Sequence, residues 1–206
     1  MTKRGATVVL VCLLILAGMA YAVTPGGQEN AIVERIAREC ASMKTMSCDF
    51  RQIRTVPLME EPQVSSGSML YRQPSRLKWI YDEPVSYTFT IDDDRISLDT
   101  PDGHSDLDGE SGRMFKGLAG IVLGCMSGKN LTDKRLFQTT ATEKDGEWVA
   151  VLIPQRREMK RVFSEIVMVF DPATALLKRM TMKDQTGGST EIEISNATVN
   201  ADEADW

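Results

Sequence analysis

The segment "GSMLYRQPSRLKWIYDEP", Gly67–Pro84, decides the fold class of this chain. Apolar side chains alternate with polar ones on both sides of Gln73-Pro74-Ser75, with the period of two that a strand has when one face is dry. The segment therefore predicts two strands joined by a turn. Its dry face contacts either another layer of protein or a molecule that the protein carries.

The same alternation continues along most of the chain. Met46, Cys48 and Phe50 open a strand before the hairpin, and more strands are predicted at 87–91, 96–98, 148–153, 163–170, 176–183 and 190–194. Turns are predicted at Asp145-Gly146, Asp171-Pro172 and Thr186-Gly187-Gly188. Residues 28–44 form an amphipathic helix, because Ile32, Ile36, Cys40 and Met43 share one face. The pattern predicts a single antiparallel sheet with a helix at its start.

A second helix is predicted within "SGRMFKGLAGIVLGCMSG", Ser111–Gly128, where apolar residues recur at helical spacing. Gly117, Gly120 and Gly124 lie beside them, and each interior glycine costs a helix about 1 kcal/mol relative to alanine. Such a helix depends on what its apolar face contacts. It is either a packing helix that approaches a strand closely or a lid that can be displaced.

The N-terminus has the pattern of a secretory signal peptide, residues 1–22. Lys3 and Arg4 precede the apolar run Val8–Ala17, and the small residues around Ala22 mark the cleavage site. The run is shorter than the roughly 20 residues that a spanning helix needs. We therefore expect a single domain over residues 23–206, located outside the cytoplasm after export.

Charge and motifs argue against nucleic-acid binding and catalysis. Without Lys3 and Arg4, the 24 basic residues fall to 22 against 29 acidic ones, a net charge of −7, which gives no attraction to nucleic acid. His104 is the only histidine, and neither a nucleophile elbow nor a zinc spacing accompanies it. The acidic segment Asp99–Glu110 lacks EF-hand spacing and is predicted to be a solvated loop. We expect no enzyme, cofactor or metal site.

Three cysteines remain after the signal peptide: Cys40, Cys48 and Cys125. An oxidising compartment permits a disulfide, and the odd number leaves at least one free thiol. Cys40 and Cys48 are the candidate pair, since both fall on inward faces of adjacent elements. Buried free thiols that behave as small hydrophobic groups are the open alternative.

The hairpin resembles that of the LolA family of periplasmic lipoprotein carriers. In that family a glycine leads into a strand, a basic-x-proline turn follows, and an aromatic strand ends at another proline. The residues that keep this spacing are Gly67, Met69, Tyr71, Arg72, Pro74, Leu77, Trp79 and Pro84. The similarity extends to Cys48–Gln52, to the Asp92–Arg95 turn and to the late hairpin at 162–184, and covers roughly Ile32 to Val199.

The resemblance implies a mainly β, α+β fold: an unclosed antiparallel β-barrel with an N-terminal helix and a helical lid that enclose a hydrophobic cavity. The family binds the acyl chains of lipoproteins that an inner-membrane ABC transporter releases, and delivers them to an outer-membrane acceptor. Each buried methylene contributes about 0.8 kcal/mol, so a multi-acyl anchor does not cross water unaided. The implied partners are acylated lipoproteins, the transporter and the acceptor, and the carrier is expected to be a monomer.

We expect two groups of residues to form the lipid site. The sheet side is Phe50, Met69, Tyr71, Leu77, Trp79, Tyr81, Phe89 and Ile91, and the lid side is Met114, Phe115, Leu118, Ile121 and Val122. Lid gating is expected at Arg72, Gln73 and Arg76. The family usually has arginine where Gln73 stands, and an amide lacks the charge-assisted fork of that residue.

Other interpretations stay open. Alternating apolar residues are ordinary core in most proteins. A carrier of another lipid, such as a glycolipid or a pigment ester, would share fold and cavity, and a lipid-sensing envelope regulator can share the fold. Methionines are abundant around the expected cavity, and their flexible thioethers suit a surface that repacks around varied ligands.

Overall fold

The structure is a computed structural model that describes residues 25–93, 95–107 and 120–201. The predicted signal peptide and the lid residues Met114, Phe115 and Leu118 lie outside these ranges and stay predictions. The chain starts with α1 (Pro25–Ser42), close to the helix predicted at 28–44. Ile32, Ile36 and Cys40 of α1 are buried, as their shared face predicts, and so is Met43, which directly follows the helix.

Eleven strands form one sheet in which every pair of neighbours is antiparallel. The strands are β1 (Thr45–Thr55), β2 (Gln63–Arg72), β3 (Arg76–Glu83), β4 (Tyr87–Asp92), β5 (Arg95–Thr100), β6 (Gly103–Asp106), β7 (Phe137–Lys144), β8 (Glu147–Pro154), β9 (Phe163–Phe170), β10 (Leu177–Asp184) and β11 (Ser189–Val199). Their order is β6-β5-β4-β3-β2-β1-β11-β10-β9-β8-β7, so the first and last strands meet in the middle. Within the described ranges β6 and β7 end the sheet without pairing, which confirms the unclosed antiparallel architecture.

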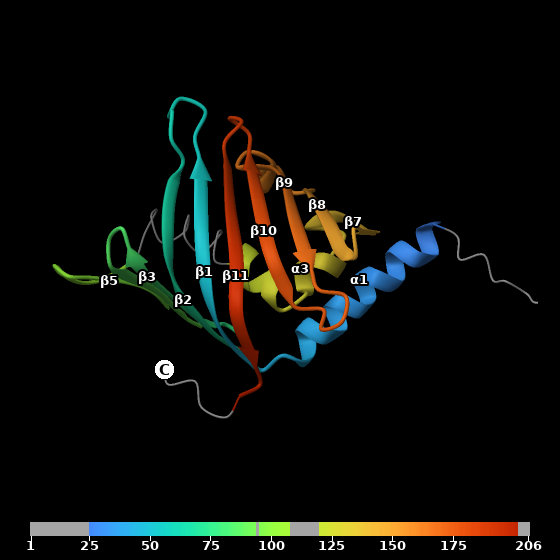
Figure 1. The fold of residues 1–206 in the computed structure, drawn as a ribbon, viewed down its shortest axis with the longest axis horizontal. Coiled ribbons are helices and arrows are strands. Elements are labelled where there is room, and N and C mark those ends of the chain that lie inside the picture. Colours follow the sequence, from blue (N-terminus) through green and yellow to red (C-terminus); the bar gives the residue numbers. More distant parts are fainter. Residues whose placement is uncertain (1–24, 94, 108–119, 202–206) are drawn as a thin grey trace, which may run out of the picture.

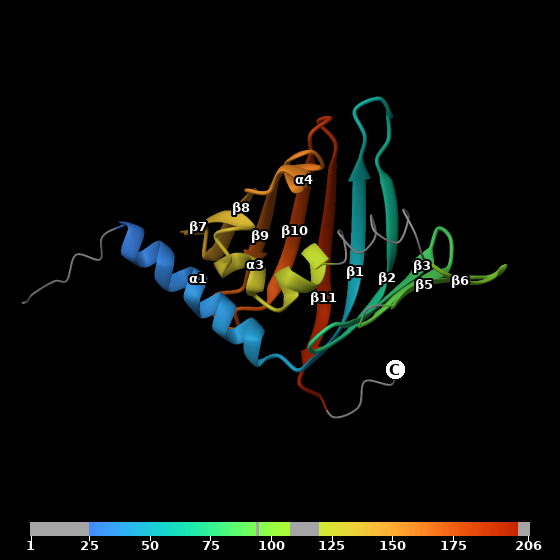
Figure 2. The same cartoon turned by 180° about the vertical axis from the view of Figure 1, so that it is seen from behind.

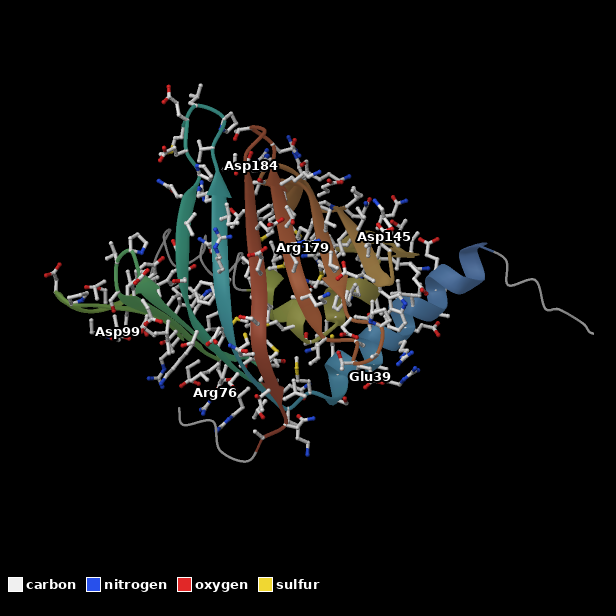
Figure 3. The ribbon with its side chains drawn as sticks, in the orientation of Figure 1. Glu39, Arg76, Asp99, Asp145, Arg179 and Asp184 are labelled. Carbon is white, nitrogen blue, oxygen red and sulfur yellow. The ribbon has the colours of Figure 1, made fainter. Side chains whose placement is uncertain are left out.

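The helices gather on one face of the curved sheet. Figures 1 and 2 show α1, the short α3 (Lys129–Thr132) and the helical residues 120–126 on the same concave side. The short α4 (Arg157–Lys160) lies at the connection of β8 and β9. On the opposite face the strands carry charged side chains, of which Arg179 on β10 is labelled in Figure 3. Its neighbour Met180 is buried on the concave side, as the alternation of a strand requires.

Gly67 allows the unusually close approach of β2 and β3. A Cβ at this position would lie 1.9 Å from the carbonyl oxygen of Ile80, a distance that no side chain tolerates. The pairing of the two strands also shifts register between Ser66 and Gly67. Glycine at the start of the hairpin is therefore a steric requirement of this bulge.

Four elements differ from the sequence-based expectation. The segment Asp99–Glu110 was expected to be a loop, but its described part contains the end of β5 and all of β6, whose residues are exposed. β7 was not predicted, because only Phe137 and Ala141 of its eight residues are buried. The helices α3 and α4 have four residues each, too few for a helical period. The Asp145-Gly146 turn is confirmed, with φ of 53° and 75°, and joins β7 to β8.

Candidate functional site

The inner face of the β2–β3 hairpin is fully covered in this structure. Tyr71 and Leu77 expose none of their surface, and Met69 exposes 3%. Trp79 and Tyr81 expose 9% and 8%. The prediction that these five side chains share a dry face is confirmed.

An aromatic cluster forms one wall of this face. The ring of Phe50 meets Trp79 edge-on at a centroid distance of 5.5 Å and Tyr81 at 5.0 Å. Tyr81 also stacks on Tyr87 at 4.3 Å, and its hydroxyl donates to Oε1 of Gln52 at 3.0 Å. Burial raises the pKa of Tyr81, so its hydroxyl stays protonated at neutral pH. Aromatic pairs contribute about 0.5–1.5 kcal/mol each beyond their burial, which makes this wall rigid.

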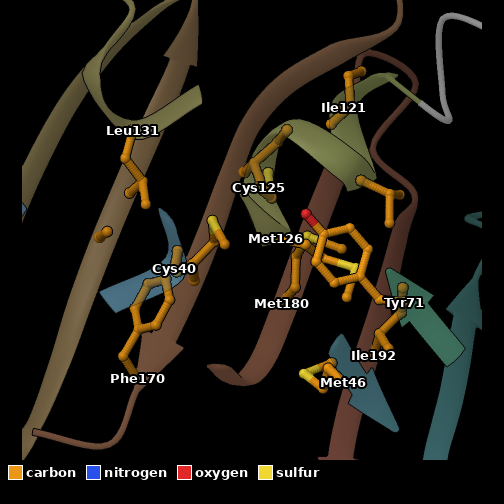
Figure 4. Packing of buried hydrophobic residues seen from close by; sticks show 14 of the residues in the cluster. Cys40, Met46, Tyr71, Ile121, Cys125, Met126, Leu131, Phe170, Met180 and Ile192 are labelled. Atoms are coloured by element: carbon orange, nitrogen blue, oxygen red, sulfur yellow. The ribbon is translucent and has the colours of Figure 1, made fainter. Parts of the chain in front are cut away.

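The helical residues 120–126 pack against the concave face of the sheet. Four of their side chains, those of Ile121, Val122, Cys125 and Met126, are buried, and Figure 4 shows three of them close to the sheet. The position of this helix agrees with the predicted lid, of which Ile121 and Val122 are described members. Their contact with lipid stays a prediction.

A buried amide from α3 holds this helix in place. Nδ2 of Asn130 donates to the carbonyl oxygen of Ile121 at 2.9 Å and lies 3.7 Å from Sγ of Cys125. Asn130 exposes only 4% of its surface. A Cβ on Gly124 would lie 2.3 Å from Oδ1 of Asn130, so glycine is required where the amide approaches the helix. We call this contact the Asn130 clamp.

Two of the cavities among the described residues lie between the helices and the sheet. The smaller has about 20 Å³ and is lined by Met69, Trp79, Val122, Cys125, Met126, Leu177, Met180, Ile192 and Ile194. The larger has about 140 Å³, and its lining is Glu39, Cys40, Ser42, Met43, Met46, Cys125, Met126, Phe170, Thr174, Ala175, Leu176, Leu177, Val199 and Asn200. Cys125, Met126 and Leu177 line both cavities. The helix 120–126 therefore divides a space that would be continuous without it.

Three buried polar atoms have no hydrogen-bond partner among the described residues: the hydroxyl of Tyr71, Nε1 of Trp79 and the hydroxyl of Thr139. Two of them, on Tyr71 and Trp79, come from neighbouring strands of the hairpin. Thr139 lies on β7, at the far end of the sheet. Burial is the main cause that raises the pKa of Tyr71, so its hydroxyl remains a proton donor.

The predicted sheet-side residues separate into two groups in the structure. Met69 and Trp79 line the smaller cavity together with the predicted lid residue Val122. Phe50, Tyr71, Leu77, Tyr81 and Ile91 are buried without lining either cavity, and Phe89 is half-buried. Most of the actual lining lies on β9–β11 and on α1, and the sequence analysis did not assign it to the site. The inward alternation of those strands was its available signal.

Two of the predicted gating residues, Gln73 and Arg76, have partners outside the helix 120–126. The side-chain amide of Gln73 donates to the carbonyl oxygen of Ala41 at 2.9 Å, in the last turn of α1. Arg76 forms an ion pair with Asp92 across β3 and β4, with Nε 2.7 Å from the carboxylate. Both partners of that pair are exposed. In this structure Gln73 joins the hairpin turn to α1, and the gating role of Arg72, Gln73 and Arg76 stays a prediction.

The candidate disulfide is not formed in the structure. Cys40, Cys48 and Cys125 are free and buried, which is the alternative that the sequence left open. Cys48 on β1 is paired with Met69 on β2. Cys40 packs instead beside Gly128, where an added Cβ would lie 3.1 Å from the Cβ of Cys40. Burial raises the pKa of Cys40 to about 11 and the pKa values of Cys48 and Cys125 to about 12. The thiolate is the reactive form, so these thiols are chemically inert at neutral pH.

The described residues offer no catalytic constellation at this site. His104 lies on the exposed strand β6, where its Nδ1 is 2.6 Å from a carboxylate oxygen of Asp99 and its Nε2 is 3.4 Å from Asp106. Among the described residues no three His, Cys, Asp or Glu side chains are grouped to hold a metal. In the same ranges no helix has the length and apolar character needed to cross a membrane.

Comparisons with known proteins identify relatives of this chain. The sequence profile of the family "Outer membrane lipoprotein carrier protein LolA" matches residues 41–205. An outer-membrane lipoprotein carrier protein of Methylobacillus flagellatus is 24% identical over 169 residues, which is 82% of this chain and 78% of the relative. Among solved structures, a LolA superfamily protein from Nitrosomonas europaea is 10% identical, with a TM-score of 0.46 over 85% of this chain and 94% of its own. The lipoprotein LppX of Mycobacterium tuberculosis is 15% identical, with a TM-score of 0.48 over 85% and 99%.

Proposed function

Because this chain belongs to the family of the outer membrane lipoprotein carrier protein LolA, we propose that it is a periplasmic carrier of acylated lipoproteins. On this proposal it takes the acyl chains of lipoproteins released from the inner membrane by an ABC transporter and delivers them to an acceptor in the outer membrane. The observation that carries the proposal is the helix 120–126, which lies between an apolar cavity and a larger, mixed one on the concave face of an unclosed sheet.

The cavities are too small to hold an acyl chain as they stand. A cavity of about 150 Å³ lined by apolar side chains binds one benzene molecule, and the larger cavity here has about 140 Å³. A lipid anchor therefore enters only if the helix 120–126 moves away from the sheet. The structure represents the closed carrier on this proposal.

The closed, empty carrier and the open, loaded carrier are close enough in free energy for reversible loading. Removing the buried side chains of Ile121, Val122 and Met126 from the sheet costs roughly 1.5–3 kcal/mol each, or about 5–9 kcal/mol in total. An acyl chain of about 15 methylenes gains about 12 kcal/mol from burial at about 0.8 kcal/mol each. One chain is thus enough to replace the helix, and the closing helix in turn offsets most of the cost of release.

A release assay tests the proposal. Energised inner-membrane vesicles that carry a labelled lipoprotein are mixed with the purified secreted protein, and the supernatant is probed for a soluble complex. We expect a complex with the natural sequence and none with Val122→Glu, which places a charge on the buried face of the helix. Gly120→Glu is the matched control, because position 120 is exposed and a Cβ there meets no atom within 4 Å.

The other outcomes decide against lipoprotein carriage. If no complex forms but a fluorescent acyl ligand still binds, the protein carries or senses a different lipid of the envelope. If neither release nor acyl binding occurs, the concave face is an ordinary core. A complex that survives Val122→Glu as well as Gly120→Glu would show that the helix 120–126 does not cover the binding surface.

A further inference from the structure

Two buried hydrogen-bond donors lie on the inner face of the β2–β3 hairpin, one of them on the wall of the smaller cavity. Tyr71 exposes none of its surface and Trp79 exposes 9%, yet the hydroxyl of Tyr71 and Nε1 of Trp79 lack a partner in the described part of the chain. Burying a donor without a partner is unfavourable, because the donor loses the hydrogen bond that it makes to water in the unfolded chain. Such a donor is free to bond to an acceptor on a ligand.

The two donors lie on the same face of the β2–β3 hairpin. Tyr71 pairs with Leu77 and Met69 pairs with Trp79 in the β2–β3 register, so Tyr71 and Trp79 are diagonal neighbours on the concave face. Trp79 lines the smaller cavity. Figure 4 shows the hydroxyl of Tyr71 directed toward the side where Cys125 and Met126 lie. The Tyr71 hydroxyl is therefore directed toward the helix that would move when lipid enters (Figure 4), and Trp79 lines a cavity that the same helix borders.

A third buried aromatic donor, the hydroxyl of Tyr81, has a hydrogen-bond partner. Tyr81, on the same strand as Trp79 and equally buried, donates to Oε1 of Gln52 at 3.0 Å. The neighbouring strand β1 can thus supply a partner for a buried aromatic donor of the hairpin. The two that lack one are those beside the helix 120–126.

The chemistry of the site selects the acceptor. The indole N–H of Trp79 can only donate, and burial keeps the Tyr71 hydroxyl protonated by raising its pKa. The two lining sets contain no lysine or arginine in the described residues. A buried carboxylate would be left without a counter-charge there, which is strongly unfavourable. A neutral carbonyl oxygen meets both requirements.

We propose that Tyr71 and Trp79 donate hydrogen bonds to the ester carbonyl oxygens of a diacylglyceryl group, so that the site selects esterified lipid over free fatty acid and over ether lipid. The inference rests on the proposed function, because it assigns the polar recognition inside the same lipid site. A lipoprotein anchor and free diacylglycerol share this chemistry.

The test compares lipids that differ only in the carbonyl. The purified protein is titrated with dipalmitoylglycerol, with di-O-hexadecylglycerol, which lacks both carbonyls, and with palmitate. We expect the ester lipid to bind at least tenfold more tightly than the ether lipid, since a factor of ten corresponds to about 1.4 kcal/mol, the size of one or two net hydrogen bonds. Palmitate should bind more weakly than the ester lipid.

Variants assign the preference to the two donors. Tyr71→Phe and Trp79→Phe keep an aromatic ring and should each reduce the ratio of ester to ether affinity several-fold. Thr139→Val also removes a buried hydroxyl that lacks a partner, but one on β7 at the far end of the sheet that lines neither cavity, and should leave the ratio unchanged. Infrared spectra of lipid with a ¹³C-labelled ester carbonyl should show a shift to lower frequency in the complex, which each donor variant reduces.

The outcomes separate this inference from carriage itself. Equal binding of ester and ether lipid by the natural sequence would overturn the inference and leave acyl carriage standing. An ester preference that both donor variants retain would also overturn it. Binding of neither lipid would end both proposals. An ester preference without a soluble lipoprotein complex would support the inference and identify free lipid as the source.

Discussion

Shortening the side chain of Met126 should weaken the closed state and strengthen lipid binding at the same time. Met126 exposes 5% of its surface and lines both cavities, so Met126→Ala joins them into one. Removing a buried methionine side chain typically costs 2–5 kcal/mol. A cavity term of about 24 cal/mol per Å³ over roughly 80 Å³ gives about 2 kcal/mol of that. We expect the free energy of unfolding to fall by about 3 kcal/mol.

The stability that the closed state loses in Met126→Ala should appear as tighter binding of an acyl ligand. If the contacts of Met126 exist only in the closed state, the equilibrium between closed and open carrier shifts toward open by the whole 3 kcal/mol, a ceiling of about 100-fold in affinity. The lipid itself replaces some of those contacts in the natural protein. An increase of roughly tenfold is therefore expected.

The assay is displacement of a fluorescent fatty-acyl probe, with urea unfolding of the same samples as the measure of stability. Ile166→Ala is the matched control, because Ile166 is fully buried on β9 and lines neither cavity. It should lose comparable stability without any gain in affinity. If Met126→Ala binds the probe no more tightly than Ile166→Ala, the helix 120–126 does not compete with lipid, and the reasoning fails.

Gly67→Ala should reduce the free energy of unfolding by more than about 2 kcal/mol, because its Cβ would lie 1.9 Å from the Ile80 carbonyl oxygen. Gln73→Leu should cost about 1 kcal/mol for its lost bond to α1 while leaving acyl affinity unchanged. His104 should titrate above 6.5 in an NMR experiment, because its bond to Asp99 raises the pKa, and Asp99→Asn should lower it. The stability from this pair is complete below pH 6.5 and is lost as pH rises through the raised pKa of the folded state.

Each of these outcomes has a control in the same chain. Ser68→Ala, one residue from Gly67, should change stability by no more than about 0.5 kcal/mol, and an equal loss in both variants would contradict the steric argument. A change in acyl affinity for Gln73→Leu would restore the gating role expected from the sequence. A His104 pKa at or below 6.5 would mean that Asp99 does not hold the imidazolium in solution.

The inward residues of the sheet were predictable because a strand has only two faces. Alternation alone placed Tyr71, Leu77 and Trp79 on one side, and burial confirms it. The same rule failed for β7, which has only two buried residues, Phe137 and Ala141. An edge strand of this kind carries too little apolar pattern to be distinguished from a loop.

The cavity lining was not predictable from local pattern. Met126 belongs to the helical face that the sequence indicated, but Leu177 and Ile192 come from β10 and β11, about 50–70 residues further along the chain. They meet the hairpin because β1 pairs with both β2 and β11, and that strand order is a property of the whole sheet. The donors of Tyr71 and Trp79 were equally hidden, since the lack of a partner depends on every neighbour in space.

The two described glycines of the helix 120–126 have different surroundings, which the sequence could not distinguish. Each costs about 1 kcal/mol of helix stability. Gly124 is fixed by the Asn130 clamp, because a Cβ there would lie 2.3 Å from the amide oxygen, whereas Gly120 faces open space. The helix is therefore weak in itself and held by tertiary contacts: the clamp, and the apolar contacts of Met126 and its neighbours. On the proposed function, this balance lets the segment leave the sheet without unfolding it, because the strands keep the hydrogen bonds of their own ladders.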